Sequence, residues 1–286
     1  MIHSIFDIKG FIILSVIFVM LFLLESKFRL RRRIQNRWSR IWTNLLVSIP
    51  AFSLLRLLLL PVMVWIALKN QDLHIGINYL YHSPSWIKAT AAFLMLDYIN
   101  YLWHLINHKI PMLWRFHLVH HTDPDLDITT AFRFHFGELI GSVFFRGAAV
   151  FLTGTSPLTV MVYEIVFEAA TQFHHSNWKL PFKLERILNM LFVTPRMHGI
   201  HHSVIRQETD SNFSVIFSIW DRIHHTIRLN VNQDRLVIGV PAYDKPDELT
   251  TAYLLRLPFT KIRSWKKGTE VRKPNELLPD KNKLSE

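Results

Sequence analysis

The chain has 286 residues and contains no cysteine. This absence excludes a secreted fold held by disulfides, a zinc finger with thiolate ligands, an iron–sulfur protein and a cysteine nucleophile. Glycine is also scarce, with nine residues, and the composition excludes a collagen-like or disordered chain. Any metal that this protein binds must therefore be held by nitrogen or oxygen atoms.

Hydrophobic residues make up 50% of the chain, and the mean hydropathy is +0.17. They gather in runs that approach the roughly 20 residues a helix needs to cross a bilayer. We therefore expect an all-α, multi-pass membrane helical bundle with about four or five crossing segments. The expected segments are residues 10–24, 41–68 and 86–103, followed by a hairpin of two shorter helices within 139–173 that is interrupted at Gly154, Ser156 and Pro157.

The formal net charge is +11, and its densest basic cluster directly follows the first apolar run. This basic cluster comprises Lys27, Arg29, Arg31, Arg32, Arg33, Arg37 and Arg40. Positive residues beside a membrane span fix its orientation toward the cytoplasm. This rule places the N-terminus outside and puts the central histidines on the cytoplasmic side, in a histidine-rich helical cap. No basic–aromatic recognition module accompanies the charge, so we expect no nucleic-acid partner.

Histidine is the residue in excess, with 16 copies against nine glycines and seven tyrosines. His104 and His108 are four residues apart, which places them on one face of a helix. An H-x-x-H-H pattern then occurs twice, as His117, His120 and His121 and again as His198, His201 and His202. These imidazoles exceed what one tetrahedral ion can bind, so two metal ions are the economical interpretation.

Other histidines need no such explanation. His3, His74 and His82 fit ordinary polar residues at membrane boundaries, and a structural role is favoured for the pair His224 and His225. Spacing alone does not identify the metal, because imidazole suits zinc, copper, iron and nickel alike. The chain has no H-E-x-x-H motif, which argues against a zinc hydrolase. Two metals held by neutral imidazoles could instead bind and reduce dioxygen.

The ordered boxes resemble the fatty acid hydroxylase superfamily, the integral-membrane di-iron enzymes that include sterol desaturases. The resemblance covers residues 86–259, and the last boxes are most similar to prokaryotic members. The motifs are H-L-I-N-H at 104–108, H-L-V-H-H at 117–121, R-F-H at 133–135 with Glu138, F-H-H-S-N at 173–177, T-P-R-M-H at 194–198, H-H-S at 201–203, D-S-N-F at 210–213 and W-D-R at 220–222.

The resemblance implies two irons and O2-dependent oxidation of a lipid C–H bond, with electrons from a reductase, ferredoxin or cytochrome. It favours the cytoplasmic (inner) membrane of a prokaryote over the endoplasmic reticulum. The implied metal ligands are His104, His108, His117, His120, His121, His175, His198, His201 and His202.

Five further residues are candidates for accessory roles. His135 is a candidate accessory ligand, and His174 adds a second histidine where the family pattern needs one. Independently of the family, Asp210, Asn212 and Asp221 are suitable partners for the second N–H of a ligating imidazole. The alternative for these three is a capping or surface role.

These features lead to the hypothesis of a membrane-bound di-iron oxidoreductase that hydroxylates or desaturates a lipid, such as a fatty acyl chain or a sterol. The alternative is a zinc transporter or sensor of the membrane. A transporter should carry its ligands near the bilayer midplane in interrupted helices, whereas these boxes lie at the ends of the expected spans. No fused flavin or cytochrome domain is visible, so the electron donor must be external.

We expect three regions along the chain. Residues 1–85 form N-terminal membrane anchor helices, 86–260 form a hydroxylase-like di-iron domain, and 261–286 form a basic, disordered tail. Asp97, inside the third expected span, is expected to make a polar contact between helices.

Overall fold

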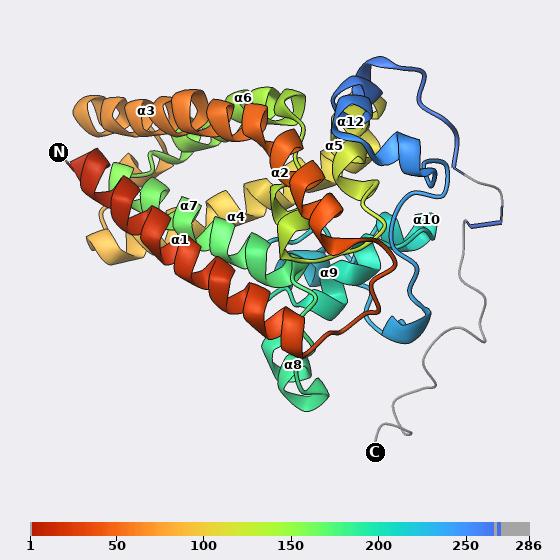
Figure 1. The fold of residues 1–286 in the computed structure, drawn as a ribbon. Coiled ribbons are helices and arrows are strands. Elements are labelled where there is room, and N and C mark those ends of the chain that lie inside the picture. Colours follow the sequence, from red (N-terminus) through yellow and green to blue (C-terminus); the bar gives the residue numbers. More distant parts are fainter. Residues whose placement is uncertain (1, 266–267, 270–286) are drawn as a thin grey trace.

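The computed structural model describes residues 2–265 and 268–269, and the regular elements in this part are all helical (Figure 1). No strand is formed there beyond three isolated bridges, so the predicted all-α class is confirmed. The long helices are α1 (Ile2–Lys27), α2 (Arg37–Leu54), α3 (Leu60–Leu73), α4 (Ser85–Lys109), α6 (Phe136–Thr153) and α7 (Pro157–His175). The shorter ones are α5 (Pro111–His121), α8 (Phe182–Asn189), α9 (Pro195–His201), α10 (Arg206–Thr209), α11 (Ile219–Ile223) and α12 (Thr251–Arg256).

The long helices form a bundle, and the short helices α5, α9, α10 and α12 gather at one of its ends (Figure 1). The bundle core is apolar and lies between α3, α4, α6 and α7. Met63, Leu96, Val150 and Tyr163 are among its fully buried side chains. Between helices in a membrane, such side chains stabilise the bundle by van der Waals packing.

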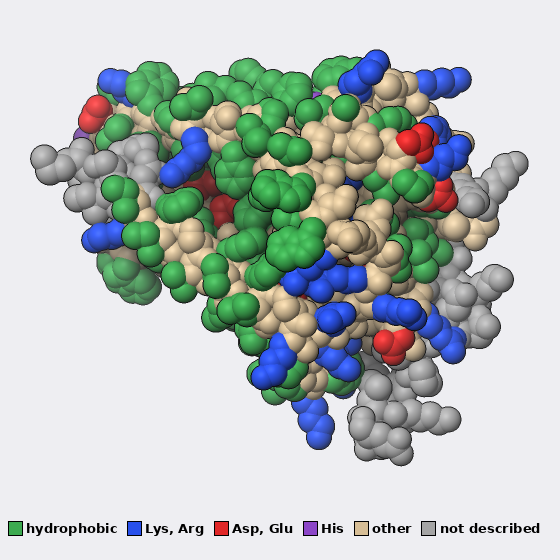
Figure 2. Space-filling model, viewed as in Figure 1, with side chains coloured by type: hydrophobic (Ala, Val, Ile, Leu, Met, Phe, Trp, Pro, Cys, Tyr) green, Lys and Arg blue, Asp and Glu red, His purple; other side chains and the backbone are tan. Residues whose placement is uncertain are grey.

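Three segments are long and apolar enough to cross a membrane: Ile8–Lys27, Arg37–Tyr79 and Phe136–Thr153. They overlap the first two expected spans and the first half of the expected hairpin. The expected span at 86–103 lies in α4 and the second half of the hairpin lies in α7, but neither helix reaches the same apolarity in the described residues. The total number of crossings stays a prediction. Figure 2 shows hydrophobic side chains spread over the face of α1 and α3, with basic side chains more frequent toward the other end.

The segment from α2 to α3 changes direction (Figure 1), and it contains Pro50 and Pro61. Between the two prolines, Leu55–Leu59 forms a π-helical stretch. Proline cannot donate the helical hydrogen bond to the residue four positions earlier, so the turn before Pro61 accommodates a different pairing. Leu55 of this stretch lines a cavity described below.

The predicted break between α6 and α7 is present. Gly154 ends α6 in the left-handed conformation at φ 68°, and Ser156 caps α7 by accepting a hydrogen bond from the Thr159 N–H. Pro157 occupies the first turn of α7, where a missing N–H has no cost. Gly154 also packs against the backbone of Gly76, which leaves no room for a side chain at either position. The two loops at this end of the bundle are therefore held together.

Two arginines of the basic cluster are buried rather than placed at a membrane surface. Arg40 pairs with Asp123 at 2.8 Å and with Asp127 at 2.6 Å. Arg31 donates to the Pro195 carbonyl and to Gln233. The sequence alone indicates only that this cluster orients the chain in the membrane. In the fold, Arg31 and Arg40 also attach the segment between α1 and α2 to the part of the chain that carries the histidines.

The expected anchor region makes further close contacts with the rest of the chain. The buried carboxylate of Glu25 accepts hydrogen bonds from the Asn177 N–H at 2.9 Å and the Ile128 N–H at 3.1 Å. Helix α1 packs against α7, and α2 and α3 pack against α6. The division at residues 85 and 86 stays a prediction. Most of the expected tail, residues 266–267 and 270–286, lies outside the described residues.

Asp97 is buried in α4, and its contacts are with a later segment rather than with a neighbouring long helix. It accepts hydrogen bonds from Trp220 Nε1 at 2.7 Å and from the Phe217 N–H at 3.2 Å. The polar contact that we expected is present, and it ties α4 to the start of α11.

Candidate metal centre

The histidines come from four helix ends that meet where the bundle joins the short helices. His104 and His108 lie in the last part of α4, and His175 ends α7. The remaining ones lie on α5 and at α9, namely His117, His120, His121, His198, His201 and His202. Pro111 and Pro195 begin these two short helices, where their fixed φ favours the first turn.

The nine histidines form two groups, and within each group the potential ligand atoms all lie within 4.8 Å of one another. The group of five comprises His104, His108, His117, His121 and His201, and the group of four comprises His120, His175, His198 and His202. Each i, i+4 pair stays within one group, because both rings lie on one helical face. The middle histidine of each H-x-x-H-H box, His120 or His201, belongs to the other group.

Ring nitrogens converge in the group of four. His175 Nε2 lies 3.0 Å from His120 Nε2 and 3.0 Å from His198 Nε2, and His198 Nε2 lies 3.1 Å from His202 Nε2. The His175 Nδ1–H donates to the Thr171 carbonyl at 2.8 Å, so its Nε2 presents a bare lone pair. Two nitrogens bound at about 2.1 Å to one ion, at right angles, are about 3.0 Å apart. A single cation fits this arrangement.

The group of five shows buried lone pairs that lack a partner. The Nδ1–H of His104 donates to the Phe213 carbonyl at 2.8 Å, and that of His201 donates to the Ser211 carbonyl at 2.7 Å. Their Nε2 atoms, together with Nε2 of His108, are buried without a hydrogen-bond partner among the described residues. Buried polar atoms are normally satisfied. Their convergence here fits a second metal ion.

One extended segment orients three of the rings. Ser211, Phe213 and Val215 offer their carbonyls to Nδ1 of His201, His104 and His174, with distances of 2.8 Å for His104 and 3.1 Å for His174. Alternate residues of an extended chain face the same side, so every second carbonyl points at a histidine. Hydrogen bonds of this kind fix the tautomer and the ring orientation of a metal ligand.

The predicted accessory residues act mainly through this segment. Asp221 accepts from the N–H groups of Phe213 and Ser214, both at 2.9 Å. Asn212 donates to the carbonyls of Met197 and Arg228. Neither touches a histidine, so these two brace the segment that does.

Asp210 lies nearer to the ligands, with Oδ1 3.7 Å from His108 Nδ1. It also contacts Lys109 and Arg206. Its carboxylate is therefore shared between a buried imidazole and two cations at the edge of the site.

The two histidines predicted only as accessory candidates, His135 and His174, lie outside both histidine groups. His135 caps the start of α6 by accepting from the Gly137 N–H at 3.0 Å, and its Nε2 faces the Leu255 carbonyl at 3.2 Å. His174 donates to Val215, and its ring lies 4.1 Å from the ring of His198. His224 stacks on Tyr101 at 5.0 Å, away from the two groups. The structure therefore separates these three from the nine.

Burial favours the neutral form of eight of the nine clustered imidazoles. It is the largest cause, with neighbouring histidines adding to it, and it lowers the pKa of His175 and of His201 to about 3. It holds the pKa of further members well below the ordinary value, namely His104, His108, His120, His121, His198 and His202. Neutral imidazole is the form that binds metals. The donor set fits two first-row ions, although imidazole alone does not select iron.

Glu138 is a further functional candidate. The sequence motifs include this residue but do not indicate a role for it. Its Oε1 lies 3.1 Å from Nδ1 of His117, and both side chains are buried. A carboxylate in this position raises the basicity of a ligating imidazole. The available signal was its place in the first turn of a helix directly after a histidine motif.

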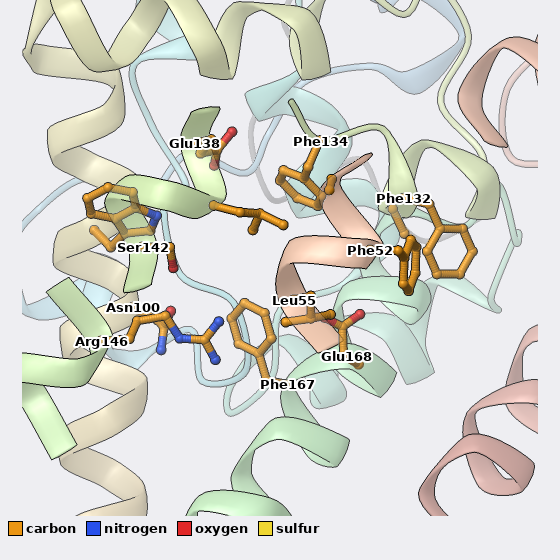
Figure 3. A pocket seen from close by; sticks show the side chains of 14 residues that line it. Phe52, Leu55, Asn100, Phe132, Phe134, Glu138, Ser142, Arg146, Phe167 and Glu168 are labelled. Carbon is orange, nitrogen blue, oxygen red and sulfur yellow. The ribbon is translucent and has the colours of Figure 1, made fainter. Parts of the chain in front are cut away.

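A cavity adjoins the histidines (Figure 3). It is partly open to the outside and lies between α2, α4, α6 and α7. Its lining is mostly apolar and aromatic, as in pockets that bind small molecules. Glu138 lines it while contacting His117, and Phe134 lines it while stacking on His120 at 4.7 Å. A ligand in this cavity would therefore contact side chains that touch both histidine groups.

Comparison with known proteins places this site in a family. Residues 89–226 match the fatty acid hydroxylase family, and this segment contains all nine clustered histidines. The family resemblance expected from the motifs is confirmed over this segment, which is similar to the fatty acid hydroxylases.

Several curated relatives are similar to the chain. A cholesterol 25-hydroxylase-like protein of Danio rerio is 26% identical over 78% of this chain and 88% of its own length. The ornithine lipid hydroxylase OlsE of Rhizobium tropici is 26% identical over 69% of this chain and 60% of its own length. Human alkylglycerol monooxygenase is 29% identical over 59% of this chain and 37% of its own length.

The alignment therefore spans nearly all of the first relative but less than two thirds of the other two. No solved structure matches this chain. The relatives are named as hydroxylases or monooxygenases acting on different lipids, which supports an oxidative enzyme in general and leaves the substrate open.

Proposed function

We propose that this protein is a membrane-bound di-iron oxidoreductase that uses O2 and electrons from an external donor to hydroxylate a lipid. The observation that carries the proposal is the pair of buried histidine groups beside an apolar cavity. The names of the relatives favour hydroxylation over desaturation. Iron is favoured over zinc because oxidation of an unactivated C–H bond requires a redox-active metal.

The protein's own contribution is positioning, exclusion of water and tuning of the metals. The nine histidines would hold the two irons, which when bound supply the reduction of O2 that breaks the C–H bond. Carbonyls of the segment 211–215 hold three rings in one orientation, and Glu138 polarises His117. Aromatic side chains of the cavity, including Phe134 and Trp103, would enclose the reacting part of the lipid.

Metal analysis together with lipid profiling tests the proposal. We expect two irons per purified chain, O2 uptake that depends on a reductant, and a lipid oxidation product in cells that make the protein. The product should be lost in the His120→Ala variant. A product that persists in this variant would remove the metal from the mechanism. Zinc without redox activity, exchanging across vesicles, would support the transporter alternative.

We also propose that the site faces the cytoplasm, in the cytoplasmic membrane of a prokaryote. Because the chain has no cysteine, single cysteines can report its topology. Lys183→Cys lies on exposed α8 near the histidine end, and His82→Cys lies in the exposed loop before α4 at the opposite end. An impermeant maleimide added to intact cells should label only the second. Labelling of the first would reverse the proposed orientation.

A further inference from the structure

The cavity next to the metal centre has a charged end. Its lining follows one face of α6, where Glu138, Ser142 and Arg146 are spaced four residues apart. An α-helix rises 1.5 Å per residue, so Arg146 lies about 12 Å from Glu138 along the helix axis. Since Glu138 contacts His117, Arg146 marks the end of the cavity that is remote from the metals.

Two glutamates of α7 accompany Arg146 at this end. Glu164 forms a buried ion pair with Arg146, whose guanidinium carbon lies 5.0 Å from the centre of the Phe167 ring. Glu168, one turn further along α7, lines the cavity itself (Figure 3). Within residues 2–265 and 268–269, Glu168 forms no hydrogen bond or ion pair. Glu164 already forms the ion pair with Arg146, so Arg146 attracts Glu168 without a hydrogen bond or an ion pair between them in the described part of the chain.

This charged end is reached through an apolar surface. Figure 2 shows acidic side chains at the bottom of a hollow, with hydrophobic side chains and a basic side chain at its rim. Phe52, Leu55 and Phe132 add apolar walls to the cavity beside Glu168 (Figure 3). An ionisable group in such a place is costly unless it meets a partner, and it is therefore a candidate for ligand recognition.

The charges decide which lipid end groups fit. A hydroxyl or an amine can donate a hydrogen bond to Glu168, and a hydroxyl can also accept one from Arg146. A free carboxylate would instead meet two glutamates and one arginine that is already paired. Discrimination of this kind depends on repulsion of the wrong ligand as much as on attraction of the right one.

We infer that Glu168 determines substrate specificity by binding the polar end of an amphiphilic lipid, and that this end carries a hydroxyl or an amine rather than a free carboxylate. The oxidised carbon would lie about 10 Å away, which is the rise along α7 from Glu168 to His175. The part of the inference that concerns oxidation rests on the proposed function. The binding preference does not, because it can be measured without turnover.

The test uses the purified full-length protein in a nonionic detergent and three ligands with one saturated chain: stearyl alcohol, stearylamine and stearic acid. We expect the alcohol or the amine to bind at least about tenfold more tightly than the acid, a difference of about 1.4 kcal/mol. Equal or tighter binding of the acid to the unmodified protein would overturn the inference, and this comparison needs no variant.

The Glu168→Gln variant distinguishes the two donor groups. Glutamine keeps an acceptor oxygen but removes the charge, so binding of the amine should weaken about tenfold while binding of the alcohol is retained. The matched control is Asp234→Asn, which removes one acidic charge from the exposed η4 turn (Gln233–Arg235) and should change neither. An unchanged amine-to-acid ratio in Glu168→Gln would refute the assigned role.

Iron content measured on the same samples separates the two proposals. Protein that holds two irons but binds the three ligands equally would contradict the inference alone. Protein without iron that still prefers the alcohol or the amine would contradict the proposed function and support the assignment of Glu168.

Discussion

The carboxylate of Glu138 lies 3.1 Å from Nδ1 of His117 and also lines the apolar cavity. One side chain thus connects the histidine group of five with the space in which a lipid would react. The Glu138→Gln variant keeps the shape and removes the charge, so it should weaken iron binding about 10–100-fold with little effect on the fold.

Chelator competition followed by metal analysis measures this affinity, and thermal unfolding monitors the fold. Ser142→Ala is the matched control, because Ser142 lines the cavity one turn further along α6 and contacts no histidine group. Iron affinity in Glu138→Gln equal to that of the unmodified protein would show that the contact with His117 does not tune the metal.

Removal of one histidine from the group of four should affect one iron more than the other. His120→Ala leaves three nitrogens in this group and all five in the other. We expect bound iron to fall from two to about one per chain, measured by elemental analysis against protein concentration. His135→Ala should retain two irons, since His135 caps α6 and lies outside both groups. Loss of iron in that control would place His135 among the ligands.

The metal-free protein should lose stability as the pH falls. The pKa of His175 and of His201 is lowered by burial to about 3, whereas an unfolded histidine titrates near 6.5. Below about pH 6.5 the unfolded chain binds protons that the folded chain does not, so stability declines from there toward about pH 3. Each such histidine contributes a slope of roughly 1.4 kcal/mol per pH unit inside this window.

Denaturant unfolding of chelator-treated protein at several pH values measures the decline. Stability that is constant between about pH 7 and pH 4 would mean that the buried histidines are protonated in the folded state. Added iron should reduce protonation further and shift the decline to lower pH, because metal and proton compete for the same nitrogens.

The basic cluster should divide into structural and surface members. Arg40→Ala leaves the buried carboxylates of Asp123 and Asp127 without their cation, and we expect a loss of about 3–5 kcal/mol in unfolding free energy. Arg32→Ala removes an exposed arginine of the same cluster and should change stability by no more than about 0.5 kcal/mol. Equal effects in chemical denaturation would show that the Arg40 pairs contribute little.

Local sequence patterns predicted the elements of this fold well because their causes are local. The all-α class follows from apolar runs of helical length, and the break between α6 and α7 follows from Gly154, Ser156 and Pro157. The pairing of His104 with His108 follows from the helical period. The sequence was less clear about α4 and α7. These helices carry the acidic residues Asp97 and Glu164, and only the fold supplies a hydrogen-bond or ion-pair partner for each of them.

The sequence by itself determined which nine histidines are available and that their spacing presents them in pairs. Only the tertiary structure decided how they divide, with His120 in one group and its neighbours His117 and His121 in the other. That division depends on the rotation of α5 against α4, α7 and α9, which is set by packing between distant segments. The same holds for Glu138 beside His117 and for Glu168 at the far end of the cavity. Both positions result from docking of whole helices, and no local spacing encodes them.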